Sequence, residues 1–290
     1  METEEHLPAR LPDHDALLAR AAELREHLHP AAVLAERSAA YVWGVDAFPD
    51  RRDAAEQVQH VCLPPHARNP ARPSVRVHRV RLEPDEHTRV SDVPVTVPLR
   101  TALDCAVYAR SLYLATGLVD RFLAAGLVGV EELAAQSGRT RSWRARERLE
   151  RVLALASPAS QSQPESWARV LFREAGLPPP TPQCPVSTAR GLFHADLGWP
   201  HQTTVVEFDS VRHHHTLEQR RQDGQRWRAM VRAGWAVVSV NLHDLGPGAG
   251  ALVLRLRRVL QARGWWCTPP EAERLDRSLW RLRRRAPVLR

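Results

Sequence analysis

The sequence predicts an α/β protein of two domains, and three observations support this prediction. Short segments alternate apolar and polar residues as strands do, for example residues 74–82 (SVRVHRVRL). Longer segments with helical periodicity are present as well, for example residues 217–233. A run rich in serine, glutamine and proline at residues 157–164 has the composition of a linker. The chain's 290 residues are enough for two domains that each bury a core.

The first half is predicted to be a smaller α+β domain, spanning residues 1–156. Proline at residue 30 suits the first turn of a helix, and residues 57–63 alternate well enough for a strand. The expected elements are helices at 15–27 and 30–43, strands at 57–63, 74–82 and 93–96, and a helical region at 98–151 with breaks near Arg110, Gly126 and Gly138.

The second half is predicted to be a mixed sheet flanked by helices, in the order α-β-β-β-α-β-α. This domain is expected to span residues 165–267, after the linker at 157–164, and to be followed by a basic C-terminal tail at 268–290. The expected elements are a helix at 165–175, two or three strands up to 209 that include a hairpin of 193–199 with 203–209, a helix at 217–233, a strand at 235–240 and a helix at 249–263.

Arginine supplies all of the chain's 41 basic side chains, and the sequence contains no lysine. This excludes enzymes that use lysine as a Schiff-base nucleophile, as a P-loop phosphate ligand or as a general base. Residues 1–138 hold 15 Arg against 20 Asp and Glu, whereas residues 139–290 hold 26 Arg against 13. Because the whole positive excess lies in the second half, we expect a polyanion such as DNA as the partner.

Cysteine usage and hydropathy indicate the compartment. The four cysteines contain no C-x-x-C pair, so neither a disulfide framework nor a zinc ribbon is expected. No stretch approaches the apolar length of a membrane span. A cytoplasmic protein with no membrane partner is therefore predicted, and its oligomeric state is left open.

Three acids gather around the predicted hairpin. Alternation in its second strand puts Glu207 and Asp209 on one face, and Asp196 lies on the neighbouring strand. Glu165, on the preceding helix, is a plausible fourth acid. Burying several carboxylates without a cation is costly, and a hard divalent ion that also bridges to phosphate would remove the cost.

Several ordered motifs over residues 160–263 resemble the DUF559 family. They are Pro164-Glu165-Ser166, the pair Asp196 and Glu207, Glu207-Phe208-Asp209-Ser210 followed by His213-His214, then Gln219, Asp223 and Ala233-Gly234-Trp235. That family is similar to the very-short-patch-repair endonucleases and belongs to the PD-(D/E)XK nuclease superfamily. The resemblance implies a restriction-endonuclease-like fold and a Mg²⁺-dependent DNA endonuclease, in DNA repair or phage defence.

The resemblance also implies a role for each matching residue. Asp196 and Glu207 would bind Mg²⁺, and Glu165 would assist. Asp209 occupies the position of the superfamily's lysine, so His213 or His214 would orient or deprotonate the attacking water, as histidine can at neutral pH. The family usually has glycine where this chain has Ser210, which leaves the activity of the site open.

The N-terminal half carries a second resemblance. Residues 35–40, which precede Trp43-Gly44, and the stretch 93–104 are similar to a region found in many actinobacterial proteins. That region is related to abortive-infection type IV antitoxins. The first domain is therefore expected to be antitoxin-like, with no role assigned to it.

Arginines close to the acids are expected to contact DNA phosphates. They are Arg220, Arg221, Arg226 and Arg228 on the helix after the site, and Arg283, Arg284 and Arg285 in the tail. Other functions stay open. The fold could be a degenerate nuclease that acts as a non-catalytic nucleic-acid-binding or antitoxin-type regulator, or a module for a protein partner. The histidine run 213–215 could instead bind zinc with His194 or His201.

Overall fold

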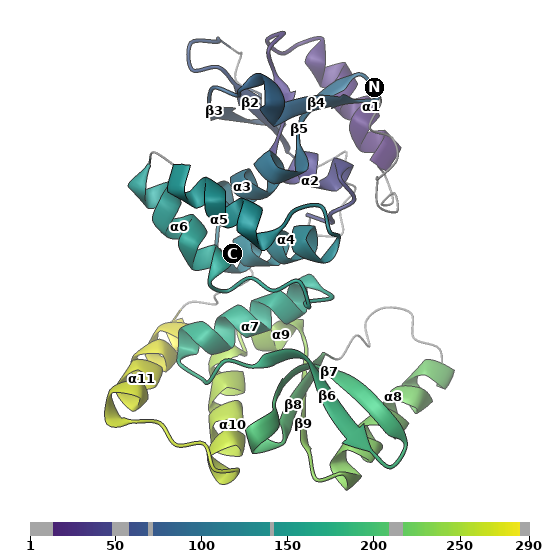
Figure 1. Cartoon of the computed structure of the whole chain (residues 1–290), viewed down its shortest axis with the longest axis vertical. Coiled ribbons are helices and arrows are strands. Elements are labelled where there is room, and N and C mark those ends of the chain that lie inside the picture. The colour runs from purple at the N-terminus through teal and green to yellow at the C-terminus, as the bar shows by residue number, and fades with distance from the viewer. Residues whose placement is uncertain (1–13, 48–57, 69–71, 140–141, 209–216, 285–290) are drawn as a thin grey trace. The chain divides into compact units, whose positions relative to one another are not determined.

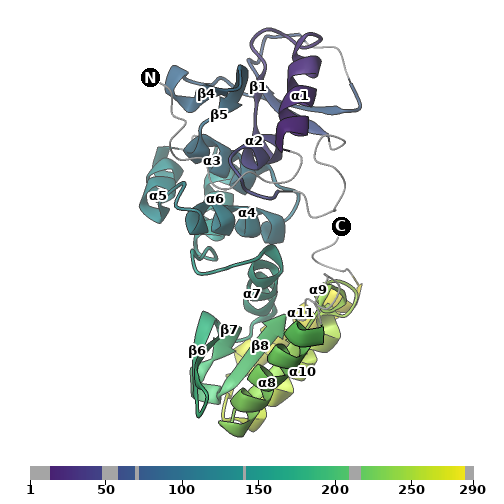
Figure 2. The same ribbon diagram turned by 90° about the vertical axis from the view of Figure 1, so that its right-hand side faces the viewer.

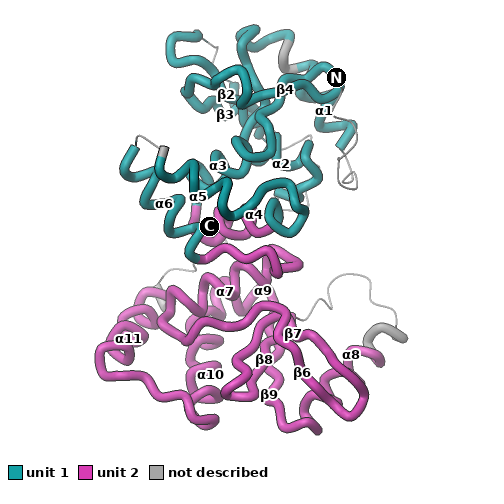
Figure 3. Tube along the Cα trace, in the orientation of Figure 1, with its two compact units in different colours: residues 1–110, 121–154 teal, residues 111–120, 155–290 magenta. Residues whose placement is uncertain are grey.

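A computed structural model describes residues 14–47, 58–68, 72–139, 142–208 and 217–284 of the chain. The chain divides into two compact units, coloured separately in Figure 3. Unit 1 comprises residues 1–110 and 121–154, and unit 2 comprises residues 111–120 and 155–290. The predicted boundary at residue 156 lies close to this division, but the segment 111–120 belongs to unit 2.

Unit 1 combines helices with a mixed sheet (Figure 1). Its elements are α1 (His14–Arg25), β1 (Val33–Leu34), α2 (Glu36–Val42), β2 (Gln59–Leu63), β3 (Val75–Arg79), β4 (His87–Val90), β5 (Val93–Thr96), α3 (Pro98–Tyr108), the end of α4 (Leu112–Ala124), α5 (Val130–Arg139) and α6 (Trp143–Leu153). The strand order is β3-β2-β1-β5-β4. Strands β2 and β3 are parallel, as are β1 and β5, whereas β1–β2 and β4–β5 are antiparallel. Helix α2 packs against β2 and α3, so the sheet and the helices share a core.

Two short strands in unit 1 were not predicted. The helix expected at 30–43 begins only at Glu36, because Val33 and Leu34 form β1 and pair with β2 on one side and β5 on the other. The polar stretch at 87–90 forms β4 through a tight turn onto β5. Ser91 and Asp92 make this turn with φ of 45° and 63°, and two positive φ angles suit the twist of a hairpin.

Unit 2 is built around a four-stranded mixed sheet of order β6-β7-β8-β9. Its elements are the start of α4, then α7 (Gln163–Ala175), β6 (Thr181–Thr188), β7 (Gly191–Trp199), β8 (Thr204–Phe208), α8 (Leu217–Arg232), β9 (Ala236–Val240), α9 (Leu242–Leu245), α10 (Ala249–Ala262) and α11 (Pro269–Arg284). Strands β6, β7 and β8 are antiparallel neighbours, and β8 and β9 are parallel. The predicted α/β class is therefore confirmed.

Helices cover both faces of this sheet, as Figures 1 and 2 show. One face presents Leu197, Val206 and Val240 to a core shared with α7, α10 and α11. The other face presents Val205 and Cys184 to Met230 of α8. The alternation of Val205 and Val206 between the two cores follows from the period of two in a strand.

The basic segment predicted as a tail forms helix α11 over most of its length. Leu275 and Leu279, four residues apart, are buried against the same core as α7 and α10. Arginines and acids surround these leucines in the sequence, so the apolar stripe is narrow. The predicted linker likewise contributes Gln163 and Pro164 to the first turn of α7.

In the part of the chain that the structure describes, no helix combines the length and the hydropathy needed to cross a membrane.

Candidate functional site

Three of the four acids predicted for the site lie on separate elements of unit 2: Glu165 on α7, Asp196 on β7 and Glu207 on β8. The ladder between β7 and β8 stops at the pair Leu197 and Val206. Beyond that pair, the Asp196 side chain replaces the backbone as the partner of β8. Its Oδ2 accepts a hydrogen bond of 2.7 Å from the backbone N–H of Phe208. Asp196 is thereby fixed beside the end of β8, where Glu207 lies.

Glu207 is buried, with 4 % of its surface exposed. Arg226 of α8 donates a hydrogen bond of 2.9 Å to Oε1 of Glu207 and also donates to the carbonyl oxygen of His194. Even so, loss of hydration and the neighbouring charge of Asp196 raise the pKa of Glu207 to about 8. A single arginine therefore does not fully compensate this carboxylate.

Glu165 has a structural role that the sequence reasoning did not assign. It is the third residue of α7, and its Oε1 and Oε2 accept hydrogen bonds of 2.8 Å from Ser162 Oγ and 3.0 Å from the N–H of Gln161. Ser162 Oγ in turn accepts from the N–H of Glu165 at the helix N-terminus, a capping arrangement. Gln183 of β6 adds a hydrogen bond of 3.3 Å.

Mutual repulsion connects the three acids. Burial raises the pKa of Glu165 and of Asp196, and the charge of Asp196 raises that of Glu165 further. Glu165 likewise raises the pKa of Glu207. Among the described residues, Arg226 is the cation that contacts this group. The cluster thus holds more negative charge than its surroundings neutralise.

A hard cation fits this donor set. Carboxylate oxygens are the ligands that Mg²⁺ prefers, and Mg²⁺ is commonly held by one or two carboxylates together with waters. Asp196 and Glu207 could supply those two. The three acids are not close enough for one ligand atom of each to lie within 4.8 Å of the others, a condition met among the described residues by a different group. Because the carboxylate of Glu165 already accepts hydrogen bonds from Gln161, Ser162 and Gln183, it fits an outer position better than a direct ligand.

Asp209, His213 and His214 lie outside the described residues, as do Ser210 and Arg285. Arg220, Arg283 and Arg284 lie on described helices, but their side chains are not described.

The remaining arginines predicted to bind phosphate divide into two kinds. Arg221 and Arg228 are exposed on α8, where a polyanion could reach them. Arg226 differs, because it is half-buried and engaged with Glu207 and His194.

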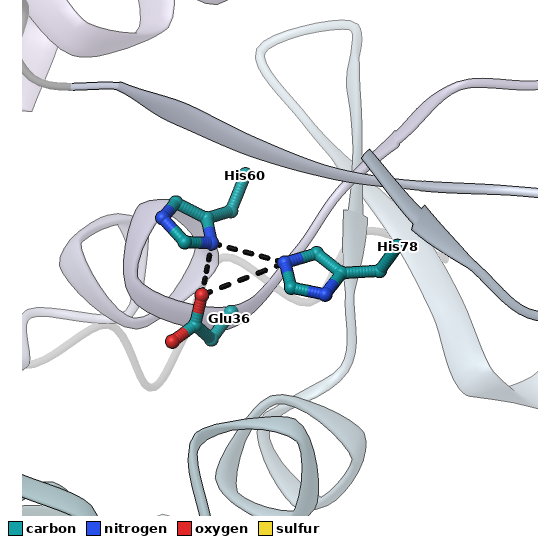
Figure 4. Close-up of side chains that lie close together, drawn as sticks. All are labelled: Glu36, His60 and His78. Atoms are coloured by element: carbon teal, nitrogen blue, oxygen red, sulfur yellow. Dashed lines mark hydrogen bonds and ion pairs between the residues drawn. The ribbon is translucent and has the colours of Figure 1, made fainter. Parts of the chain in front are cut away.

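A second polar cluster, in unit 1, was missed by the sequence reasoning. Glu36, His60 and His78 each direct one potential ligand atom to a common point, and these atoms all lie within 4.8 Å of one another (Figure 4). Burial alone would raise the pKa of Glu36, but contacts with the two histidines lower it to about 2. Burial lowers the pKa of His60. The cluster therefore contains a carboxylate and a neutral imidazole at neutral pH.

The chain is similar to an uncharacterized protein of Mycobacterium tuberculosis strain H37Rv and to one of strain CDC 1551, each 30 % identical over 178 residues. The aligned part is 59 % of this chain and 64 % of each relative, so the chain spans less than two thirds of the length of these relatives. No family model and no solved structure matches the chain. The resemblance to DUF559 therefore stays a prediction.

Proposed function

We propose that unit 2 is a Mg²⁺-dependent DNA endonuclease of the DUF559 and PD-(D/E)XK type, acting in DNA repair or phage defence. The observation that carries this proposal is the group of three mutually repelling carboxylates on α7, β7 and β8, of which Glu165 and Glu207 are buried. Nuclease sites of this class need such a group to hold a divalent ion against a phosphate.

Asp196 and Glu207 would hold the ion. When bound, Mg²⁺ supplies Lewis-acid stabilisation of the negative charge that develops on the scissile phosphate. The protein orients the two ligands: Asp196 by the N–H of Phe208, and Glu207 by Arg226. Glu165, held by Ser162 and Gln183, would position the group from α7.

The proton of the attacking water needs an acceptor. The chain has no lysine, and arginine stays protonated at neutral pH. We assign this step to His213 or His214, as the resemblance implies. A change of either histidine to glutamine is expected to lower cleavage without lowering Mg²⁺ binding.

A basic pocket on unit 2 supports DNA as the substrate. Arg190, Arg228 and Arg232 line a pocket of about 260 Å³ formed by the β6–β7 turn and α8. Guanidinium groups bind phosphate oxygens in pairs of hydrogen bonds, so this pocket suits the nucleic-acid backbone. Replacing the three arginines with alanine should weaken DNA binding and reduce its dependence on salt.

A plasmid-nicking assay in Mg²⁺ tests the proposal. Asp196→Ala and Glu207→Ala are each expected to lower the rate by roughly 100-fold or more, as the loss of a group that stabilises transition-state charge does. Glu174→Ala, an exposed acid on α7, is the matched control and should leave the rate unchanged. Equal rates in the wild type and both site variants would exclude catalysis at this cluster.

A second candidate function is a non-catalytic nucleic-acid-binding or antitoxin-type regulator on a nuclease fold. The observation that favours it is the 2.9 Å ion pair between Arg226 and Glu207, because the guanidinium supplies a cation from the chain itself. This alternative predicts DNA binding that falls steeply with salt, is undiminished by EDTA and occurs without cleavage. Mg²⁺-dependent cleavage that Asp196→Ala removes would end it.

A further inference from the structure

The cluster of unit 1 brings three ligand atoms to one point. Nδ1 of His60 lies 3.0 Å from Nε2 of His78, and Nε2 of His78 lies 3.5 Å from Oε2 of Glu36. Nδ1 of His60 also contacts the same Oε2 (Figure 4). Ligands of a tetrahedral ion with bonds of 2.0 to 2.1 Å are about 3.3 Å apart. The separations of His78 Nε2 from the other two atoms lie on either side of that value, and His60 Nδ1 and Glu36 Oε2 lie closer together and would have to move apart around an ion.

Hydrogen bonding alone leaves this cluster incomplete. Oε2 of Glu36 is buried and lies against one ring nitrogen of each histidine, and the described residues offer it no other donor. The facing nitrogens of His60 and His78 cannot both carry a proton at a separation of 3.0 Å. A single proton is therefore shared among Nδ1 of His60, Nε2 of His78 and Oε2 of Glu36, which all can accept a hydrogen bond. A metal cation could bind to a lone pair of each of these three atoms.

The surrounding structure holds the three side chains in place. His60 and His78 lie on the parallel strands β2 and β3, where Cys62 pairs with His78 in register. The N–H of His60 donates a hydrogen bond of 3.0 Å to Ser38 Oγ, and the Tyr108 ring packs on His78 with ring centroids 4.8 Å apart.

Glu36 is held by the first turn of α2 and has a backbone φ of 48°, in the left-handed region that few residues other than glycine adopt. The side chains of Glu36, His60 and His78 are 3 %, 8 % and 13 % exposed. Side chains that are already held in place and shielded from solvent lose little conformational entropy when they bind a metal.

We infer that Glu36, His60 and His78 form a binding site for a transition-metal ion, with Zn²⁺ as the ion that fits best. Two imidazole nitrogens and one carboxylate oxygen are borderline donors, which favour zinc over Mg²⁺ or Ca²⁺. Three protein ligands leave the fourth position of a tetrahedron for a water molecule. This site is independent of the carboxylate cluster in unit 2.

Arg37 competes with the ion. Its Nη2 lies 3.1 Å from Nε2 of His60, and because arginine only donates, Nε2 must accept. The proton of the neutral ring is then on Nδ1, the atom that must offer its lone pair to the metal. Zinc binding therefore moves this proton to Nε2 and requires the guanidinium to turn away. Arg37→Gln, whose amide oxygen can accept from Nε2–H, should bind zinc more tightly.

Titration of the full-length, metal-free protein with Co²⁺ and then Zn²⁺ tests the inference. The parent protein and each of its variants are made with His213, His214 and His215 replaced by glutamine, so that this histidine run contributes no ligand. We expect one equivalent of Co²⁺ to produce the strong visible absorption of a four- or five-coordinate ion, Zn²⁺ to displace it, and excess Mg²⁺ to leave it unchanged.

Variants assign the ligands. Glu36→Gln, His60→Gln and His78→Gln should each lower the affinity by roughly tenfold or more, and Arg37→Gln should raise it by about tenfold. His87→Gln, an exposed histidine of the same unit, is the control and should leave the affinity unchanged. The site is excluded if the parent protein gives no such absorption, or if Glu36→Gln and His78→Gln, folded by circular dichroism, bind as tightly as the control. Tighter binding by Arg37→Gln supports the site even where a ligand variant fails to fold.

Discussion

Buried acids are compensated in three different ways in the two units. In unit 2, Asp120 has a nearly complete set of partners, since Arg169 and the N–H of Ser157 both donate to it. In the same unit, Glu207 has one arginine and is repelled by Asp196. In unit 1, Glu36 contacts two imidazole rings.

These differences separate structural acids from candidate binding sites. A buried acid that is paired with a cation and a backbone donor needs no further ligand. A buried acid with too few partners, or with partners that have too few protons to donate, is stabilised by binding a cation. The oxygen-only group of unit 2 suits a hard ion, and the nitrogen-containing group of unit 1 suits zinc. Burial alone is therefore not enough to propose a metal site, and the number and kind of an acid's partners have to be considered with it.

The largest expected effect is at the matched pair. Arg169→Met should lower the free energy of unfolding by about 3 to 5 kcal/mol at pH 7, because it leaves Asp120 buried without a cation. Urea unfolding measures it. Arg173→Met, on the exposed side of the same helix, should cost far less.

The effect of Arg169→Met should depend on pH. Burial raises the pKa of Asp120 and Arg169 lowers it, so the variant raises this pKa further. An acid with a raised folded-state pKa keeps its proton where the unfolded chain has lost it, and stability falls as pH rises above the ordinary value of 3.8. The loss should be smallest near pH 4 and largest above neutral pH. The same loss at pH 4 and pH 8 would show that Asp120 is not the group left unpaired.

A steric change should disturb the acids of unit 2 and spare those of unit 1. A Cβ at Gly198 of β7 would lie 2.6 Å from Cys184 Sγ and 3.0 Å from Val205 Cγ1. Gly198→Ala should therefore cost about 3 kcal/mol by overpacking and shift β7 against β8. Thermal unfolding checks the cost, and adding Cys184→Ala should reduce it. Co²⁺ binding in unit 1 should be unchanged; its loss would contradict the independence of the two sites.

Removing the single arginine of the carboxylate cluster should distinguish a metal site from a degenerate one. Arg226→Met is expected to lower stability by about 1 to 3 kcal/mol in EDTA, because a buried acid loses its donor. If the acids bind Mg²⁺, the ion should restore most of this stability in a thermal melt. Failure of Mg²⁺ to do so would favour the regulator over the endonuclease.

The smallest effect is expected at Glu165. The carbonyl oxygen of glutamine can still accept from the N–H of Gln161 while its amide group donates to Ser162 Oγ, so Glu165→Gln should cost about 0.5 kcal/mol. The effect of Glu165→Gln on plasmid nicking distinguishes the role of Glu165 at the N-terminus of α7 from its proposed role beside Asp196 and Glu207. A large loss of activity at nearly full stability would show that the charge of Glu165 matters beyond the helix cap.

Local patterns in the sequence predicted much of unit 2. Alternation in β8 correctly put Val205 on the face opposite Val206, and the pairing of β7 with β8 in a hairpin was predicted as well. The cap at Glu165 could have been found, because Ser162 three residues earlier completes the usual signature. Helix α11 was missed because its two buried leucines are outnumbered by arginines.

Long-range pairing limited the prediction in unit 1. Strand β1 has two residues, too few for any periodicity, and exists because β2 and β5 lie on either side. Glu36, His60 and His78 come from three elements separated by 23 and 17 other residues in the sequence. Nothing local to these segments indicates that β2 and β3 pair in parallel, which is what brings the two histidines together.

The left-handed backbone of Glu36 has a consequence for protein design. A procedure that scores backbone conformation and packing would replace this residue with glycine, which adopts a φ of 48° without steric cost. Such a change could make the fold more stable while removing a buried carboxylate. If Glu36 binds zinc as inferred, thermostability and metal binding set opposite requirements at this position, and a library that varies only this residue would show whether the two properties change in opposite directions.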